Sequence, residues 1–173
     1  MRILFGTLLC VLLAGSGVSA AETALAGLPD VGAPEDKRLA AIAGQLQRRG
    51  YDFDHLFSEL LQVALQEATT NAHVRLDDRI RSVFGGLWIW ATGPGRPALQ
   101  RRQDWALHFI GGGAFEGYWD AGTTAGLIKE QSDARDPYNR YDLDDLTATM
   151  FGARWVDLAT TNSTADARRW IEA

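Results

Sequence analysis

Apolar residues recur every three or four positions along most of the chain, the spacing that places them on one face of a helix. The first such stripe lies between Pro34 and Gly50 and comprises Leu39, Ile42, Ala43 and Leu46. Proline suits the first turn of a helix and glycine suits its end. The pattern therefore predicts a helix between these two residues.

A second stripe covers residues 53–68, and Asp52 is placed to cap it. Residues 69–71 (Thr-Thr-Asn) weaken the helix, because their side chains compete for nearby backbone groups. The apolar pattern resumes over residues 74–87, so we expect a bend at this point and not a break. Glycine and proline in residues 92–97 (TGPGRP) then end the element.

Three more helices complete the predicted fold. One extends from Ala98 to Pro137, the next is capped by Asp142 and continues to Leu158, and a capping box at Ser163 begins a short last helix. No stretch alternates between apolar and polar residues for long enough to predict a strand. We expect an all-α fold, a compact bundle of about five helices with glycine-rich close packing, formed by a single domain over residues 34–173.

Six glycines lie between Gly111 and Gly126. Each costs about 1 kcal/mol relative to alanine inside a helix, so the close approach of another helix has to offset that cost. The stripe of small residues favours one continuous helix, in which His108 and Glu130, 22 residues apart, lie about 33 Å from each other. The alternative is a turn at residues 120–123, which allows these two side chains to meet.

The first twenty residues have the features of a secretory signal peptide. A positive start at Arg2 precedes an apolar run and a small-residue end at Ala20, where cleavage is expected. Residues 21–33 then form a flexible leader to the domain. Cys10 raises the alternative of a lipid anchor, which Leu9 disfavours because a small residue is wanted before the lipidated cysteine. The expected location is periplasmic or secreted, in a bacterium.

Charge and cysteine content narrow the possible partners. The formal net charge is −5 and becomes more negative when Arg2 is removed with the signal peptide. The sequence also contains no run of basic residues, so nucleic acid is not an expected partner. The single cysteine lies in the predicted signal peptide, which leaves the mature chain without disulfides. Trp88 and Trp90 could lie in a membrane interface or at the edge of the core. The apolar run around them has about ten residues where a membrane span needs about twenty, so the core edge is favoured and we expect no transmembrane span in the mature chain.

Two groups of polar residues are candidates for chemistry. Asp104 and His108 share a helix face, where the carboxylate could fix the imidazole tautomer, although such a pair is more often an ordinary surface contact. A second group of charged residues crowds the corner before the helix that starts at Asp142: Lys129, Glu130, Asp133, Arg140, Asp144 and Asp145. Helix capping and ion pairs account for this corner better than a calcium site, because the loop lacks the EF-hand order. No metal or cofactor is predicted.

The order of these residues resembles that of the VanZ-like proteins and the YfiM-type lipoprotein families. The resemblance covers about fifty residues and rests on four short motifs: Asp104-x-x-x-His108-Phe109, Lys129-Glu130-x-x-Asp133, Asp145-Leu146 and Gly152-Ala153. Trp105 stands where those families have lysine. The resemblance implies an envelope-associated helical protein in which His108 and Glu130 share a site. Such a shared site requires the turn at residues 120–123, because one continuous helix would hold the two side chains apart.

Two hypotheses for function follow. The first is a non-catalytic envelope module that binds a protein, a lipid or a cell-wall component, through the charged corner (Lys129, Arg140, Asp144 and Asp145) and the segment with Trp88 and Trp90. The second is a hydrolase or metal-dependent enzyme that uses His108 and Glu130 as an acid–base pair, supported by Asp104 and Asp133. The first is favoured, since no serine lies in a nucleophile motif and no His-Glu-x-x-His sequence is present.

Overall fold

The computed structural model describes residues 32–93, 95–99, 102–135 and 140–161, and these residues form an all-α fold. No strand occurs among them, apart from one isolated bridge between Leu99 and Arg102. The predicted fold class is therefore confirmed. The expected signal peptide, most of the leader and the predicted helix after Ser163 lie outside the described residues. The helices are α3 (Pro34–Arg48), α4 (Phe53–Thr70), α5 (Leu76–Thr92), α6 (Gln103–Trp119), α7 (Gly122–Asp133) and α8 (Leu143–Thr161).

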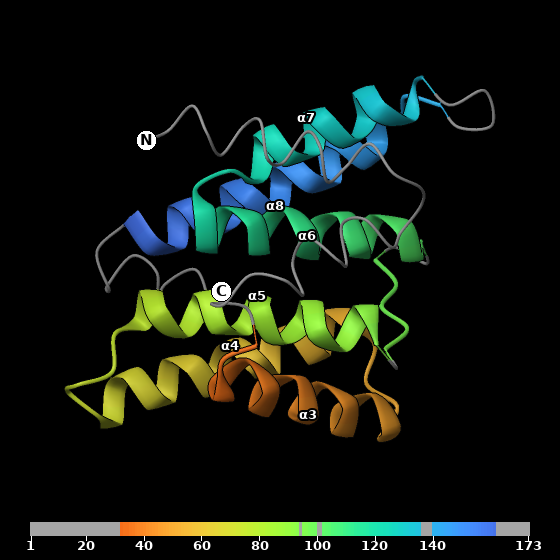
Figure 1. Cartoon of the computed structure of the whole chain (residues 1–173). Helices are drawn as coiled ribbons and strands as arrows, with labels where there is room; N and C mark the ends of the chain where they lie inside the picture. Colours follow the sequence, from red (N-terminus) through yellow and green to blue (C-terminus); the bar gives the residue numbers. More distant parts are fainter. Residues whose placement is uncertain (1–31, 94, 100–101, 136–139, 162–173) are drawn as a thin grey trace.

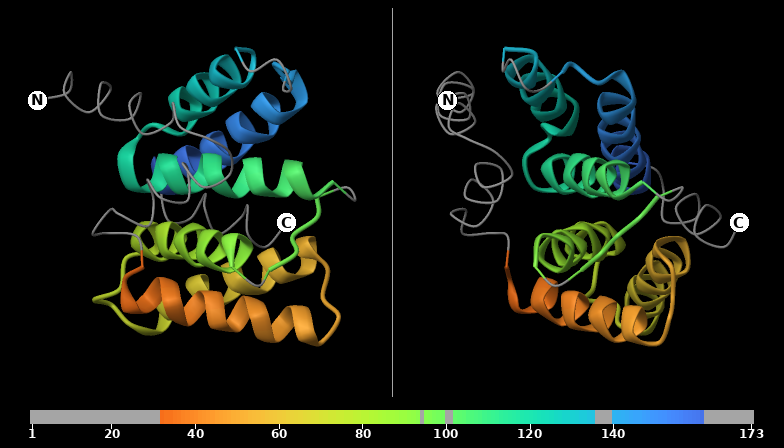
Figure 2. Two further views of the ribbon diagram at one scale, coloured as in Figure 1. Left: turned by 45° about the vertical axis from the view of Figure 1, so that its right-hand side comes forward. Right: turned by 90° about the vertical axis from the view of Figure 1, so that its right-hand side faces the viewer.

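The helices form two halves that meet at α5 and α6 (Figure 1). Helices α3, α4 and α5 make the first half, and α6, α7 and α8 make the second (Figure 2). Four aromatic rings pack edge to face or tilted between the halves: Phe57, Phe84, Phe109 and Trp155. This aromatic cluster comes from α4, α5, α6 and α8, so it ties both halves into one core.

The ends of the first helices follow their local sequence as predicted. Asp52 accepts a hydrogen bond from the backbone N–H of His55 at 3.0 Å, and Gly50 adopts a φ of 89° after the end of α3. The expected bend at residues 69–71 is wrong, because α4 ends at Thr70 and α5 starts at Leu76. The Asn71 side chain accepts from the backbone N–H of His73 at 3.0 Å and closes a turn that stops the helix.

The expected continuous helix through residues 98–137 is also wrong, since a turn separates α6 from α7. Asp120 takes the left-handed conformation with a φ of 55°, and the backbone N–H of Ala121 bonds to the carbonyl oxygen of Phe115. The Glu116 carboxylate accepts from the backbone N–H of Gly122 at 2.9 Å, which satisfies one free donor at the start of α7. The alternative turn at residues 120–123 is the one that the chain adopts.

Glycines bring α6 and α8 into backbone contact. A β-carbon on Gly112 would overlap the carbonyl of Thr149, and one on Gly152 would overlap the carbonyl of Phe109. Helix α7 is packed in the same way, because a β-carbon on Gly126 would lie 2.6 Å from the Thr149 methyl group. The predicted close helix packing through glycine is confirmed, and it gathers α6, α7 and α8 around Thr149.

None of the helices in the described ranges combines the length and the apolar character that crossing a membrane requires. The predicted absence of a transmembrane span holds for this part of the chain.

The contact between α6 and α8 predicts a large cost for a single methyl group. We expect Gly112→Ala to lower the free energy of unfolding by about 2–3 kcal/mol, because the Thr149 carbonyl belongs to a packed backbone that cannot move away cheaply. Gly44→Ala is the matched control, since its nearest atom is the flexible end of Arg48 at 3.5 Å, and it should stabilise by about 0.5–1 kcal/mol. Urea unfolding of the two variants tests this, and equal effects would contradict it.

Candidate functional site

The turn between α6 and α7 brings His108 and Glu130 together, and α8 adds Asp145 between them. Each of the three residues offers one atom that could bind a metal, and these three atoms all lie within 4.8 Å of one another. The His108 Nε2 atom lies 3.3 Å from Asp145 Oδ2. The three side chains are largely buried, with exposed fractions of 10% for His108, 15% for Asp145 and 1% for Glu130. We call these three residues the His–Glu–Asp cluster.

Hydrogen bonds around Thr149 define which nitrogen of His108 carries the proton. The Thr149 hydroxyl donates to the carbonyl oxygen of Asp145 at 3.0 Å, so its single hydrogen is already used. The His108 Nδ1 atom lies 2.9 Å from that hydroxyl oxygen, which can then only accept from it. A neutral imidazole therefore carries its proton on Nδ1 and directs the lone pair of Nε2 at the carboxylates, as in histidines that ligate metals.

Burial keeps the imidazole uncharged. Desolvation, with the positive charge of Lys129 as a second cause, lowers the pKa of His108 from 6.5 to about 4. Desolvation also raises the pKa of Asp145 from 3.8 to about 6, and the negative charge of Asp142 adds to that shift. At neutral pH an imidazole lone pair and a mostly ionised carboxylate thus face each other, and both are acceptors. Such a pair is stabilised only by a shared proton or by a cation.

Glu130 is held in place from two sides. Its Oε2 atom accepts from the backbone N–H of Asp142 at 2.8 Å, and its Oε1 atom lies 3.1 Å from the Lys129 ammonium nitrogen. Asp145 is less completely satisfied, because its Oδ1 atom is buried and has no hydrogen-bond partner among the described residues. The cluster therefore contains acceptor capacity that the surrounding protein groups do not use.

The remaining candidates from the charged corner lie outside the cluster. Asp104, predicted as the partner of His108, instead accepts a hydrogen bond from the Nε atom of Arg102 at 2.9 Å, so it does not accept one from the imidazole. Asp133 binds the Lys129 ammonium group at 2.7 Å. Arg140 and Asp144 are exposed to solvent. The capping role predicted for Asp142 is confirmed, because its side chain accepts from the backbone N–H groups of Asp144 and Asp145.

The two tryptophans proposed as a binding surface belong to the core. Trp90 is only 2% exposed, and its indole N–H donates to the side chain of Gln47 at 3.1 Å. Trp88 is half-buried and lies against the backbone of Gly111. Trp90 therefore cannot serve as an exposed membrane or partner contact, and this part of the expected binding surface is corrected.

The sequence pattern placed Asp145 only among the charged residues of the corner near Asp142, and it gave no indication of a role for Thr149. The available signal was their spacing of four residues on α8, on the same side as Gly152, which packs against α6. That spacing puts the Asp145 carboxylate and the Thr149 hydroxyl on the face turned toward His108. The sequence could not show that this face meets the histidine, because the contact depends on the turn at Asp120.

The hydrogen-bond chain through Thr149 predicts one tautomer of His108. In the metal-free protein at neutral pH we expect the proton on Nδ1, and Thr149→Val should remove this preference because the acceptor hydroxyl is lost. Thr149→Ser keeps a hydroxyl and should keep the preference. The ¹⁵N chemical shifts of the imidazole ring report the tautomer, and an unchanged tautomer in the valine variant would contradict the prediction.

The lowered pKa of His108 predicts a specific pH dependence. In the folded metal-free protein His108 should titrate near pH 4, while in the unfolded chain it titrates near 6.5. Because the folded state binds this proton less strongly, the contribution of His108 to stability decreases as pH falls from about 6.5 to about 4. His108→Gln should therefore gain stability relative to the parent protein over that range. NMR titration and urea unfolding at both ends of the range measure the two effects, and a constant stability difference would be inconsistent with them.

No family model, no curated protein and no solved structure matches this chain. The resemblance to the VanZ-like and YfiM-type families stays a prediction.

Proposed function

We propose that this chain is an exported, envelope-associated helical protein that binds one divalent transition-metal cation, of the zinc class, at His108, Glu130 and Asp145. The observation that carries the proposal is the convergence of an imidazole lone pair and two carboxylates in one buried place. Export rests on the predicted signal peptide at residues 1–20.

The donor set favours a transition metal over calcium or magnesium. Calcium and magnesium prefer oxygen ligands alone, whereas zinc and its neighbours accept imidazole nitrogen together with carboxylate oxygen. Zinc lies about 2.0–2.2 Å from such atoms, which places two ligands of a tetrahedral site about 3.4 Å apart. The distance of 3.3 Å between His108 Nε2 and Asp145 Oδ2 fits this geometry. A cation there would also neutralise the two facing acceptors.

Lys129 is the group that a metal would have to displace. Its ammonium nitrogen lies 3.1 Å from Glu130 Oε1 and 2.7 Å from Asp133, and its side chain is 41% exposed. Because Asp133 binds the same ammonium group, Lys129 can leave Glu130 and keep one ion pair. Lys129 therefore acts as a competing cation for the Glu130 carboxylate.

Burial favours a binding role over catalysis. Three protein ligands leave the fourth position of a tetrahedral zinc open, as in catalytic sites, but a catalytic zinc also needs that position to be reachable by water and substrate. The three ligands here have exposed fractions of 10%, 15% and 1%, which leaves little room for a substrate to approach. A metal-binding module is thus better supported than a hydrolase that uses His108 and Glu130 as an acid–base pair.

Isothermal titration with zinc tests the proposal directly. We expect one zinc ion per chain, and affinity reduced at least about tenfold in His108→Gln and in Asp145→Asn, because each variant loses a ligand atom. Asp104→Asn is the matched control: this aspartate is four residues from His108 but binds Arg102, so its affinity should be unchanged. Absence of stoichiometric zinc, or equal losses in the control, would refute the proposal.

Replacement of Lys129 distinguishes a metal-binding site from a cluster that is held together by ordinary ion pairs. Lys129→Met removes a positive charge that competes with the metal for Glu130. Because this charge is partly exposed and screened, its removal should strengthen zinc binding by about 1 kcal/mol, or about fivefold in affinity. We expect tighter zinc binding in this variant, measured by the same titration. If Lys129 were instead needed for the site, zinc binding would weaken.

A further inference from the structure

The outward face of α8 is unusually apolar for a surface helix. Leu143 is 68% exposed, Met150 is 45% exposed and Phe151 is 67% exposed. Thr147 and Arg154 are also exposed and continue the same face, since these residues are spaced by three or four positions. We call this set the α8 stripe. It lies opposite the side that carries Asp145 and Thr149 and packs on α6.

Exposed apolar side chains are concentrated in this part of the molecule. Among the described residues six large hydrophobic side chains are exposed, and only Tyr51 belongs to the first half of the chain. The other five come from α7, α8 and the segment between them: Leu127, Tyr141, Leu143, Met150 and Phe151. Exposed apolar side chains that gather in one part of a molecule mark an interaction surface more than isolated ones do.

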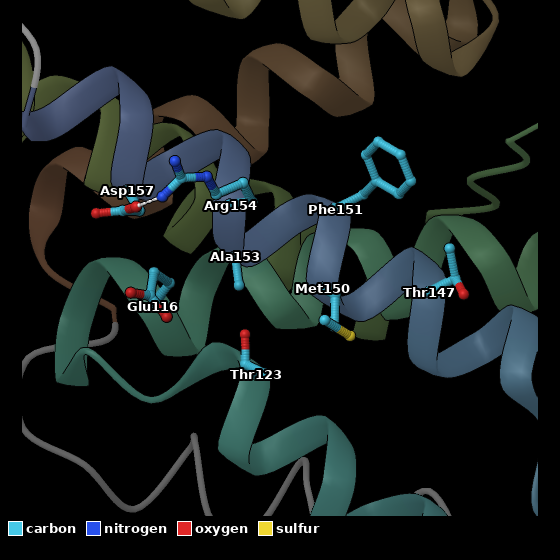
Figure 3. A pocket seen from close by; sticks show the side chains of 8 residues that line it. All are labelled: Glu116, Thr123, Thr147, Met150, Phe151, Ala153, Arg154 and Asp157. Carbon is cyan, nitrogen blue, oxygen red and sulfur yellow. Dashed lines mark hydrogen bonds and ion pairs between the residues drawn. The ribbon is translucent and has the colours of Figure 1, made fainter.

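A groove lies on each side of the stripe. One, with a volume of about 480 Å³, lies between α8 and the start of α7, with Met150, Thr123 and Glu116 in its lining. Figure 3 shows Met150 directed toward the helix of Thr123, while Phe151 projects from another side of α8. The second groove, of about 310 Å³, is lined by Trp105 and Phe109 of α6 as well as by Phe151. A ridge between two grooves is the shape that packs against another helix.

The charges of the stripe indicate what that other helix is. Asp144 lies near one end and Arg154 near the other, ten residues or about 15 Å apart along α8. Both side chains are exposed, and among the described residues Arg154 pairs with Asp157 at the rim of the first groove. An identical helix that runs antiparallel across the stripe would place Asp144 against Arg154 of the partner subunit, and the reverse contact would follow from the two-fold symmetry.

We propose that the α8 stripe is the interface of a homodimer in which two α8 helices pack antiparallel. Phe151 of each subunit enters a groove beside α8 of the other, and two reciprocal Asp144–Arg154 pairs flank the apolar centre. A parallel arrangement would place Asp144 opposite its own copy and is disfavoured by repulsion. Among the described residues this face holds two acids, Asp144 and Asp157, one base, Arg154, and no lysine, so it lacks the positive charge that attracts anionic lipid. This inference does not depend on the metal site.

Sedimentation velocity of the purified full chain over a dilution series tests the dimer. We expect a concentration-dependent dimer, and Phe151→Glu should make the protein monomeric because it places a charge in the apolar centre. Tyr51→Glu is the control: this residue is 40% exposed in the first half of the chain and should leave the dimer intact. A chain that is monomeric at every concentration, or a Phe151→Glu variant that still forms the dimer, overturns the proposal.

Charge reversal tests the antiparallel arrangement itself. Asp144→Arg alone and Arg154→Asp alone should each raise the dimer dissociation constant at least about tenfold, because each places like charges face to face. The double variant restores opposite charges and should return the constant to within about threefold of the parent. Both positions are exposed, so helicity measured by circular dichroism should not change. A double variant that is as weak as the single variants would overturn the arrangement.

Discussion

The close contact between the backbones of α6 and α8 is the constraint on which the rest of this structure depends. Gly112 and Gly152 each lie where a β-carbon would overlap the carbonyl of the facing helix. Only glycine at both positions allows the two helices to approach this far, and the packing of α6, α7 and α8 offsets the helix propensity that glycine lacks. The same approach brings the Thr149 hydroxyl within 2.9 Å of the His108 ring.

The electrostatic character of the His–Glu–Asp cluster is a consequence of that packing. Helices this close exclude water, and desolvation is the largest cause both of the lowered pKa of His108 and of the raised pKa of Asp145. Both shifts reduce the charge on buried groups, yet the cluster keeps more acceptors than donors. A cation of the zinc class meets this imbalance, which is why the proposed function is metal binding.

The two faces of α8 have separate roles in these proposals. The inner face carries Asp145, Thr149 and Gly152 and completes the cluster with α6 and α7. The outer face carries Met150 and Phe151, which are 45% and 67% exposed. One helix thus connects the proposed metal site to the proposed dimer interface, although each proposal rests on its own residues and is tested by its own variants.

Local sequence determined the helical character of this protein, because periodic apolar residues and caps such as Asp52 and Asp142 act within a few positions. It also identified His108 and Glu130 as a possible pair, but not whether they meet. Their meeting depends on Asp120 in a left-handed conformation, which aspartate tolerates without requiring, so no local preference settles the turn. The inclusion of Asp145, the proton position on His108 and the burial of Trp90 were decided only by tertiary packing, because each depends on residues distant in sequence.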